Sequence, residues 1–171
     1  MATNYPTSSI IGADFNSTGT TQLFALGTKA HGTSNTEYVY CYTTTAVTAY
    51  KCVAIQAGGT MGMASGSDVI AGYQLGFAQT SFAAGEYGWV PIRGEGLGVM
   101  TTGQATVTLA IANGQYCVAA SGASTGTLST VATGSGTVYG VAFTSAQTTG
   151  GATVTGAIIT WPKAAGGGMG G

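Results

Sequence analysis

Few side chains in this sequence could take part in acid, base or nucleophilic chemistry. His31 is the only histidine, so a serine or cysteine nucleophile that depends on a histidine base would have to use it. The sequence around it, KAHGT, supports no such site and predicts an exposed surface loop. We therefore expect no catalytic triad.

Two of the carboxylates have a spacing that could support catalysis. Glu86 and Glu95 flank a predicted strand at residues 87–92, and a pair of carboxylates is the machinery of glycoside hydrolysis. Glu86 follows a glycine at a predicted turn, however, and Glu95 lies in the sequence RGEG, where it serves as a turn charge or as a partner for Arg93. With so few titratable residues, we expect the protein not to be an enzyme.

The cysteines do not have the spacing of a metal site. Cys41, Cys52 and Cys117 lack a C-x-x-C pair, and one histidine does not complete a common zinc ligand set. All three lie in strand-like stretches, and their odd number favours free thiols, although Cys41 and Cys52 could pair if they opposed each other in a hairpin. The GEGLG run at residues 94–98 is not followed by a helical pattern, so we expect neither a metal nor a cofactor.

Composition narrows the class of protein further. Only 5% of the residues are charged, against about 25% in an average soluble domain. Four lysines and arginines with a net charge of −1 argue against contact with nucleic acid, which requires cations to displace counterions. The chain lacks a signal sequence and an apolar run of about 18 residues, so we expect a soluble protein with no membrane contact. Weak charge repulsion between copies suits a dense assembly.

The elements that must position these residues are predicted to be strands. Apolar and polar residues alternate with a period of two along much of the chain, and Gly, Thr or Ser residues separate the alternating segments. No window shows the apolar face of an amphipathic helix. The predicted strands span residues 21–26, 37–43, 50–56, 69–79 (broken near Gly72 or Gly76), 87–92, 97–100, 105–111, 116–120, 137–143 and 152–161.

We predict a single all-β domain, an antiparallel β-sandwich or a barrel-like, jelly-roll-like fold with extended termini. The domain spans residues 21–163, between an N-terminal arm at residues 1–20 and a glycine-rich tail at residues 164–171. A weak sequence similarity between residues 76–81 and residues 140–145 leaves open a division of the domain into two similar halves.

A tyrosine stripe is the first candidate surface. In an extended strand Tyr38, Tyr40 and Tyr42 project to one face, and Val39 and Cys41 project to the other. The stripe is either one half of the core with hydroxyls at its rim or a contact surface between subunits, where tyrosine is enriched. Both interpretations remain open.

The segment at residues 84–94, AGEYGWVPIRG, carries the second set of candidates. Tyr87 and Trp89 occupy alternate positions, and Gly88 between them allows a ring or a backbone to approach closely. Pro91 cannot donate a ladder hydrogen bond, so the strand should be at an edge or end at a bulge there. With Arg93 these residues form a packing or interface surface, and stacking of carbohydrate on the two rings is the functional alternative.

The same segment carries a resemblance to a known family. GFAQ at residues 76–79 and GEYGWVPIRG at 85–94, preceded by LG at 26–27, EYVY at 37–40 and KCV at 51–53, occur in the order seen in small virion proteins of tailed phages. The resemblance covers residues 23–100 and implies a head-associated structural protein with a β-rich fold, no cofactor and no catalytic residues. The low charge and the glycine tail depart from the family pattern.

From this resemblance we expect a decoration or cement protein that binds over junctions between major capsid proteins. Its partners would be the major capsid protein and copies of itself, as a dimer or trimer at a symmetry axis. It would be assembled in the host bacterial cytoplasm and lie on the capsid exterior. The alternative is a receptor- or glycan-binding fibre or knob domain that uses exposed aromatic residues such as Trp89 or Tyr73. A major coat subunit is a third class, but the chain is short and lacks a helical pattern.

Overall fold

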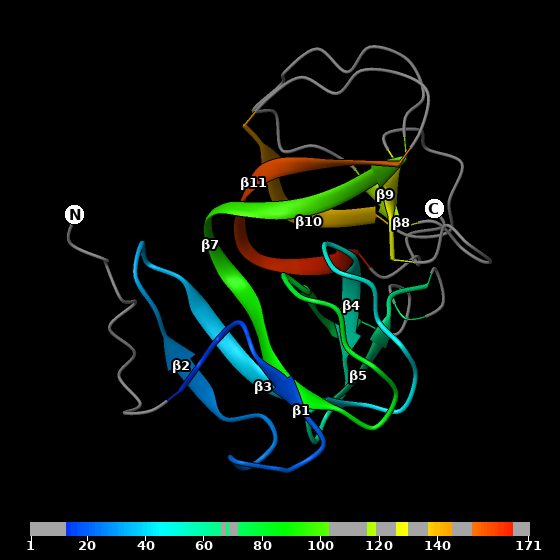
Figure 1. Ribbon diagram of the computed structural model, residues 1–171. Coiled ribbons are helices and arrows are strands. Elements are labelled where there is room, and N and C mark those ends of the chain that lie inside the picture. Colours follow the sequence, from blue (N-terminus) through cyan, green and yellow to red (C-terminus); the bar gives the residue numbers. More distant parts are fainter. Residues whose placement is uncertain are drawn as a thin grey trace.

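The computed structural model describes residues 13–65, 68, 72–102, 116–118, 126–129, 137–144 and 152–165. The regular elements in these residues are strands, joined in one curled sheet (Figure 1). The prediction of an all-β, barrel-like fold is confirmed. The predicted strand at residues 105–111 lies outside the described residues.

Within the described ranges, eleven strands make up the sheet. They are β1 (Thr18–Gly19), β2 (Lys29–His31), β3 (Glu37–Thr43), β4 (Cys52–Ile55), β5 (Thr60–Met63), β6 (Gln74–Phe77), β7 (Tyr87–Thr102), β8 (Tyr116–Val118), β9 (Leu128–Ser129), β10 (Thr137–Phe143) and β11 (Ala152–Ala165).

The sheet closes on itself through its two longest strands, β7 and β11. The strand order is β1-β7-β9-β8-β10-β11-β6-β4-β5-β3-β2, and β7 also pairs with β11 and with β3. Two hydrogen-bonded circuits result, one through β9, β8 and β10 and the other through β3, β5, β4 and β6, and both include β7 and β11. Most pairings are antiparallel, while β3–β5 and β7–β9 are parallel.

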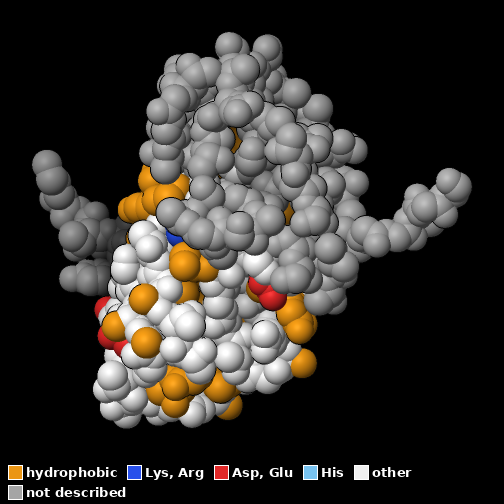
Figure 2. All heavy atoms as spheres, turned by 90° about the vertical axis from the view of Figure 1, so that its right-hand side faces the viewer, with side chains coloured by type: hydrophobic (Ala, Val, Ile, Leu, Met, Phe, Trp, Pro, Cys, Tyr) orange, Lys and Arg blue, Asp and Glu red, His pale blue; other side chains and the backbone are white. Residues whose placement is uncertain are grey.

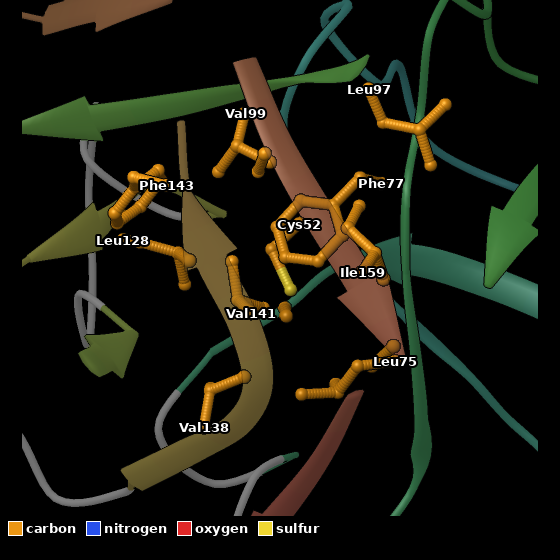
Figure 3. Close-up of a cluster of buried hydrophobic side chains, with 13 residues drawn as sticks. Cys52, Leu75, Phe77, Leu97, Val99, Leu128, Val138, Val141, Phe143 and Ile159 are labelled. Carbon is orange, nitrogen blue, oxygen red and sulfur yellow. The ribbon is translucent and has the colours of Figure 1, made fainter. Parts of the chain in front are cut away.

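Two apolar cores lie on opposite faces of β4, which is buried along its whole length. Cys52 and Ala54 face the first core, and Val53 and Ile55 face the second, as alternation along a strand requires. Figure 3 shows the first core, where side chains from several strands point into one shared interior. Its larger members are Leu75, Phe77, Leu97, Val99, Leu128, Val138, Val141, Phe143 and Ile159.

Strand β7 contributes to both cores because it changes face part-way along. Val90 and Ile92 pack into the second core, whereas Leu97 and Val99 pack into the first. Between these pairs the backbone takes positive φ angles at Gly94 (148°) and Gly96 (69°), which glycine adopts at little cost. Two separate strands, 87–92 and 97–100, were predicted here, but the glycines bend one continuous strand and do not end it.

Two local predictions for β7 are confirmed, one of them in part. The pairing with β3 shifts register where Tyr38 opposes Pro91 and Glu37 opposes Arg93, so a bulge follows the proline as predicted, but β7 neither ends there nor lies at an edge. A Cβ atom on Gly88 would lie 2.6 Å from Cε1 of Phe82, so the phenyl ring occupies the space that the missing side chain leaves.

The hairpin of β3 and β4 that the sequence left open does not form, because β5 lies between them and pairs with both. The predicted strand at residues 21–26 is wrong, since these residues form no strand. Leu23 in this segment is 71% exposed, whereas Phe24 and Leu26 pack against an aromatic cluster without joining the sheet.

Candidate functional site

The predicted tyrosine stripe lies on the outer face of β3, beside the aromatic residues of β7. Tyr40 opposes Trp89 in register, with ring centres 5.1 Å apart, and Tyr42 opposes Tyr87, with ring centres 4.7 Å apart. Val39 and Cys41 point the other way, into the second core. The predicted separation of the two faces is therefore confirmed, and cross-strand aromatic pairs join the two segments that the sequence singled out.

The segment before β2 covers much of this aromatic face. The ring of Phe15 stacks on the ring of Tyr38, with ring centres 4.1 Å apart, and meets the ring of Trp89 edge-on, with ring centres 5.4 Å apart. Phe24 packs against both Tyr40 and Trp89, with ring centres 5.3 and 5.1 Å away. Tyr40 and Trp89 each remain only 3% exposed, so within a single chain they act as core residues.

Tyr38, Tyr42 and Tyr87 are half-buried, and their ring edges reach the surface. Burial raises the pKa of the Tyr38 phenol, since the charged form would lose hydration. A role for these three residues in contact between subunits stays a prediction.

A hollow of about 190 Å³ remains between the covering segment and the sheet. Its lining includes four aromatic rings, from Phe24, Tyr40, Tyr87 and Trp89. The remaining lining residues are short and mostly polar, with one exposed leucine: Asp14, Ser17, Thr18, Gly19, Thr20, Thr21, Leu23 and Gly88. The backbone N–H of Leu23 donates to the Tyr40 hydroxyl at 3.1 Å, which ties the covering segment to β3 beside the hollow. We call this hollow the aromatic pocket.

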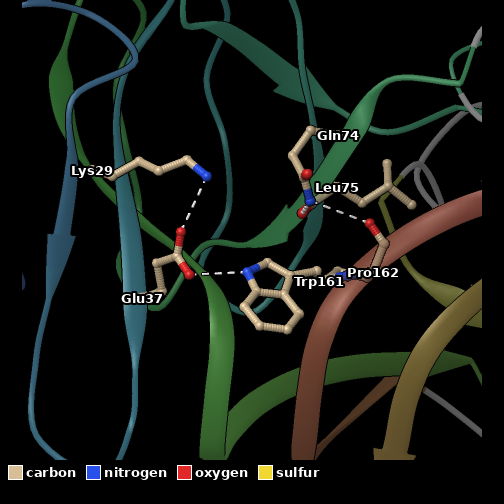
Figure 4. Close-up of polar contacts among 6 residues, drawn as sticks. All are labelled: Lys29, Glu37, Gln74, Leu75, Trp161 and Pro162. Atoms are coloured by element: carbon tan, nitrogen blue, oxygen red, sulfur yellow. Dashed lines mark hydrogen bonds and ion pairs between the residues drawn. The ribbon is translucent and has the colours of Figure 1, made fainter.

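A second group of functional side chains meets where β3, β7 and β11 converge (Figure 4). Trp161 donates its indole N–H to Oε2 of Glu37 at 2.9 Å, and Nζ of Lys29 lies 3.1 Å from Oε1 of the same carboxylate. The Arg93 guanidinium lies 4.4 Å from the centre of the Trp161 ring. The described partner of Arg93 is therefore this ring, and of the two roles left open for Glu95 the described contacts do not show the pair with Arg93.

The Glu37 carboxylate is almost fully buried, with 6% of the residue exposed. Burial alone raises its pKa, but the hydrogen bond from Trp161 and the bond and charge of Lys29 outweigh that effect, so the pKa lies below its ordinary value. The carboxylate is therefore held in its charged form. It has no exposed face from which to act as an acid.

The residues considered for catalysis are dispersed. His31 is exposed as predicted, at the end of β2 and not in a loop, and Glu95 is exposed on β7. Glu86 accepts the backbone N–H of Ala83 at 2.7 Å, which is the turn role expected of it. In the described part of the chain, no three His, Cys, Asp or Glu residues come together as metal ligands, and no helix is long and apolar enough to span a membrane.

Cys41 and Cys52 are free thiols, as predicted. They are buried in different cores, Cys41 in the second and Cys52 in the first. Burial raises the pKa of Cys41 to about 12 and also raises that of Cys52, where the charge of Asp68 adds to the effect. Both thiols are consequently inert side chains of the core. The prediction for Cys117 falls outside the described side chains.

One further surface was missed at the sequence level. Val154 and Ile158 lie four residues apart on β11, project to the same face, and are 49% and 38% exposed. Their register partners on that face, Met100 on β7 and Ala142 on β10, are half-buried and apolar. We call these four residues the β11 outer face. Alternation could have revealed it, but residues 152–161 are apolar on both faces, so the pattern did not tell inside from outside.

A comparison of the chain with protein-family profiles, with curated proteins and with solved structures finds no match. The resemblance to virion proteins of tailed phages therefore stays a prediction.

Proposed function

We propose that this chain is a structural protein of a virus particle that decorates and cements a tailed-phage capsid. It binds over junctions between major capsid proteins on the outside of the shell, and its other partners are copies of itself, as a dimer or trimer at a symmetry axis. The role needs no catalytic residue and no contact with the genome. The proposal rests on the sequence resemblance and on one structural observation.

That observation is the uncharged, apolar β11 outer face. Val154 is about half exposed and Ile158 more than a third, in a chain with nine charged residues. Figure 2 shows how sparse charged side chains are on the described part of one face of the molecule. Such surfaces meet a partner without stripping water from ions, so association costs little desolvation energy. Adjacent exposed apolar residues are typical of sites where another protein binds.

On a capsid shell, a modest contact made by each copy is repeated many times. A cement protein occurs in many copies, and each copy that touches more than one capsid subunit gains from multivalent binding. A small apolar face on each copy is therefore enough to strengthen the whole particle against internal pressure. The half-exposed Tyr38, Tyr42 and Tyr87 are the second surface that we assign to such contacts, between copies of this chain.

The test mixes purified protein with capsids that lack it and follows the number of bound copies and the melting temperature of the capsid. We expect saturable binding at many copies per shell and a raised melting temperature. Val154→Asp or Ile158→Asp should abolish both effects, because each places a charge in the proposed contact. Thr44→Asp adds the same charge at an exposed position away from β11 and should bind normally. Absence of binding by the unaltered protein, or equal binding by all variants, contradicts the proposal.

A further inference from the structure

We propose that the aromatic pocket binds a single neutral pyranose ring of a carbohydrate. The volume of the pocket is the first argument. A cavity of about 150 Å³ is known to hold one benzene molecule, and this pocket measures about 190 Å³. It is too small for a drug-sized ligand, for which pockets start at about 300 Å³. One sugar ring, at the end or at a branch of a glycan, fits the available space.

The walls suit the apolar face of a sugar. Aromatic rings carry negative charge on their faces, which attracts the weakly positive C–H groups that a pyranose presents on one side. Trp89 and Tyr40 form the rigid and almost fully covered base of the pocket, because both are packed between the sheet and Phe24 and each is only 3% exposed. Tyr87 is half-exposed and lines the same pocket, so its ring is available to a ligand from outside.

The polar lining suits the hydroxyl edge of a sugar. Oδ1 of Asp14 accepts the backbone N–H of Asn16 at 2.9 Å, and the described contacts leave Oδ2 open to a donor. Thr18, Thr20 and Thr21 add hydroxyls, which both donate and accept. Asp14, Thr20 and Thr21 are exposed and therefore hydrated. A sugar replaces this water with hydrogen bonds of its own, whereas an apolar side chain from a peptide offers none. The lining thus favours a sugar over a peptide.

The charge of the residues that line the pocket favours neutral sugars over acidic ones. Among the described residues that line the pocket, Asp14 is the only charged one. It would repel the carboxylate of a uronic or sialic acid, whereas it accepts hydrogen bonds from a neutral hexose. The site is also prebuilt, since Thr18 pairs with Gly88 in the sheet and Leu23 is tied to the Tyr40 hydroxyl. This inference does not depend on the capsid role, and a capsid protein with such a pocket would also attach the particle to a glycan surface.

The experiment titrates the full-length protein with methyl glycosides of glucose, galactose, mannose and N-acetylglucosamine, and with a methyl glucuronide. The readouts are saturation-transfer NMR on the unaltered chain and fluorescence of a Trp161→Phe variant, in which Trp89 is the only tryptophan. Small ligands of this size bind weakly, so we expect a dissociation constant of about 1 mM for at least one neutral glycoside and weaker binding of the glucuronide.

Two variants and one control locate the binding. Asp14→Asn keeps the acceptor for Asn16 but removes the charge, and should weaken binding about tenfold. Gly19→Leu should abolish it, because Gly19 lines the pocket and a Cβ there meets no atom within 4 Å, so a larger side chain can start at this position and narrow the space for a ligand. Glu95→Gln removes an exposed charge outside the pocket and should bind like the unaltered chain.

The melting temperature of each variant shows whether it is folded. No saturable response to any neutral glycoside overturns the inference, as does equal binding by the folded Gly19→Leu variant. Saturable binding of N-acetyl-leucine amide with no response to sugars overturns it in favour of a peptide side chain. Failure of capsid binding would leave this inference intact, and failure here would leave the capsid proposal intact, because the capsid experiment tests Val154 and Ile158 on the β11 outer face and this one tests the aromatic pocket.

Discussion

Trp161 donates its indole N–H to Oε2 of Glu37 at 2.9 Å, across 124 residues of sequence. The bond joins β11 to β3 at a point where the Trp161 backbone has a φ of 44°, a left-handed conformation that bulky residues rarely adopt. The Arg93 guanidinium over the ring connects β7 to the same point. A strained corner of β11 is therefore held by contacts to the two strands that carry the aromatic face.

The first prediction concerns this corner. Trp161→Phe keeps a ring for Arg93 but removes the donor to the buried Glu37 carboxylate, and should lower the free energy of unfolding by about 1–2 kcal/mol. Lys29→Ala removes the other partner of Glu37, but the Lys29 side chain is 60% exposed, so the loss should stay below about 0.5 kcal/mol. Urea denaturation of both variants measures the difference. Equal losses would mean that the indole bond contributes nothing beyond a surface ion pair.

The second prediction concerns acid. The pKa of Glu37 is lower in the folded chain than its ordinary value of 4.5, so its contribution to stability is present above that value and is lost as the pH falls through the folded pKa. Between about pH 5 and about pH 3, the unaltered protein should lose more unfolding free energy than Glu37→Gln does. Denaturation curves at a series of pH values test this, and parallel losses in the two proteins would contradict the assignment.

The third prediction concerns the close contact between Gly88 and Phe82. Gly88→Ala places a Cβ 2.6 Å from the Phe82 ring and should cost about 1–3 kcal/mol of stability. Gly62→Ala is the matched control, because Gly62 also lies in a strand but a Cβ there meets nothing within 4 Å. Its melting temperature should stay level or rise. A tolerated Gly88→Ala would show that the ring does not fill this space.

The fourth prediction concerns the thiols. Cys41 and Cys52 are fully buried and have raised pKa values, so neither should react with iodoacetamide in the native protein at about pH 8. Both should be alkylated once denaturant unfolds the chain. Peptide mass spectrometry after each treatment distinguishes the sites. Rapid native labelling of either residue would contradict its place in the core.

The sequence predicted the strands that alternate clearly and missed those that do not. Residues 37–43 and 137–143 match β3 and β10 at both ends. β5, with the sequence TMGM, has no strong alternation, and without it a hairpin of β3 and β4 stayed open. The boundaries of the N-terminal arm and the glycine-rich tail stay predictions, since residues 1–12 and 166–171 lie outside the described residues.

The candidate sites divide in the same way. Local alternation could group the aromatic residues by strand, because alternate residues of a strand lie on the same face. It places Tyr40 with Tyr42 on one strand, and Tyr87 with Trp89 on the other. The partner of Glu37 could not be predicted, since Trp161 reaches it only after β7 and β11 have paired in register. The aromatic pocket depends on where a segment without regular structure crosses the sheet, and strand periodicity says nothing about such a crossing.

The most direct test of the proposed function is an electron cryo-microscopy map of capsids decorated with this protein. We predict density for the chain on the outside of the shell, over junctions between capsid subunits, with Val154 and Ile158 against the major capsid protein. A map with no such density, or with the β11 outer face turned to solvent, would contradict the account.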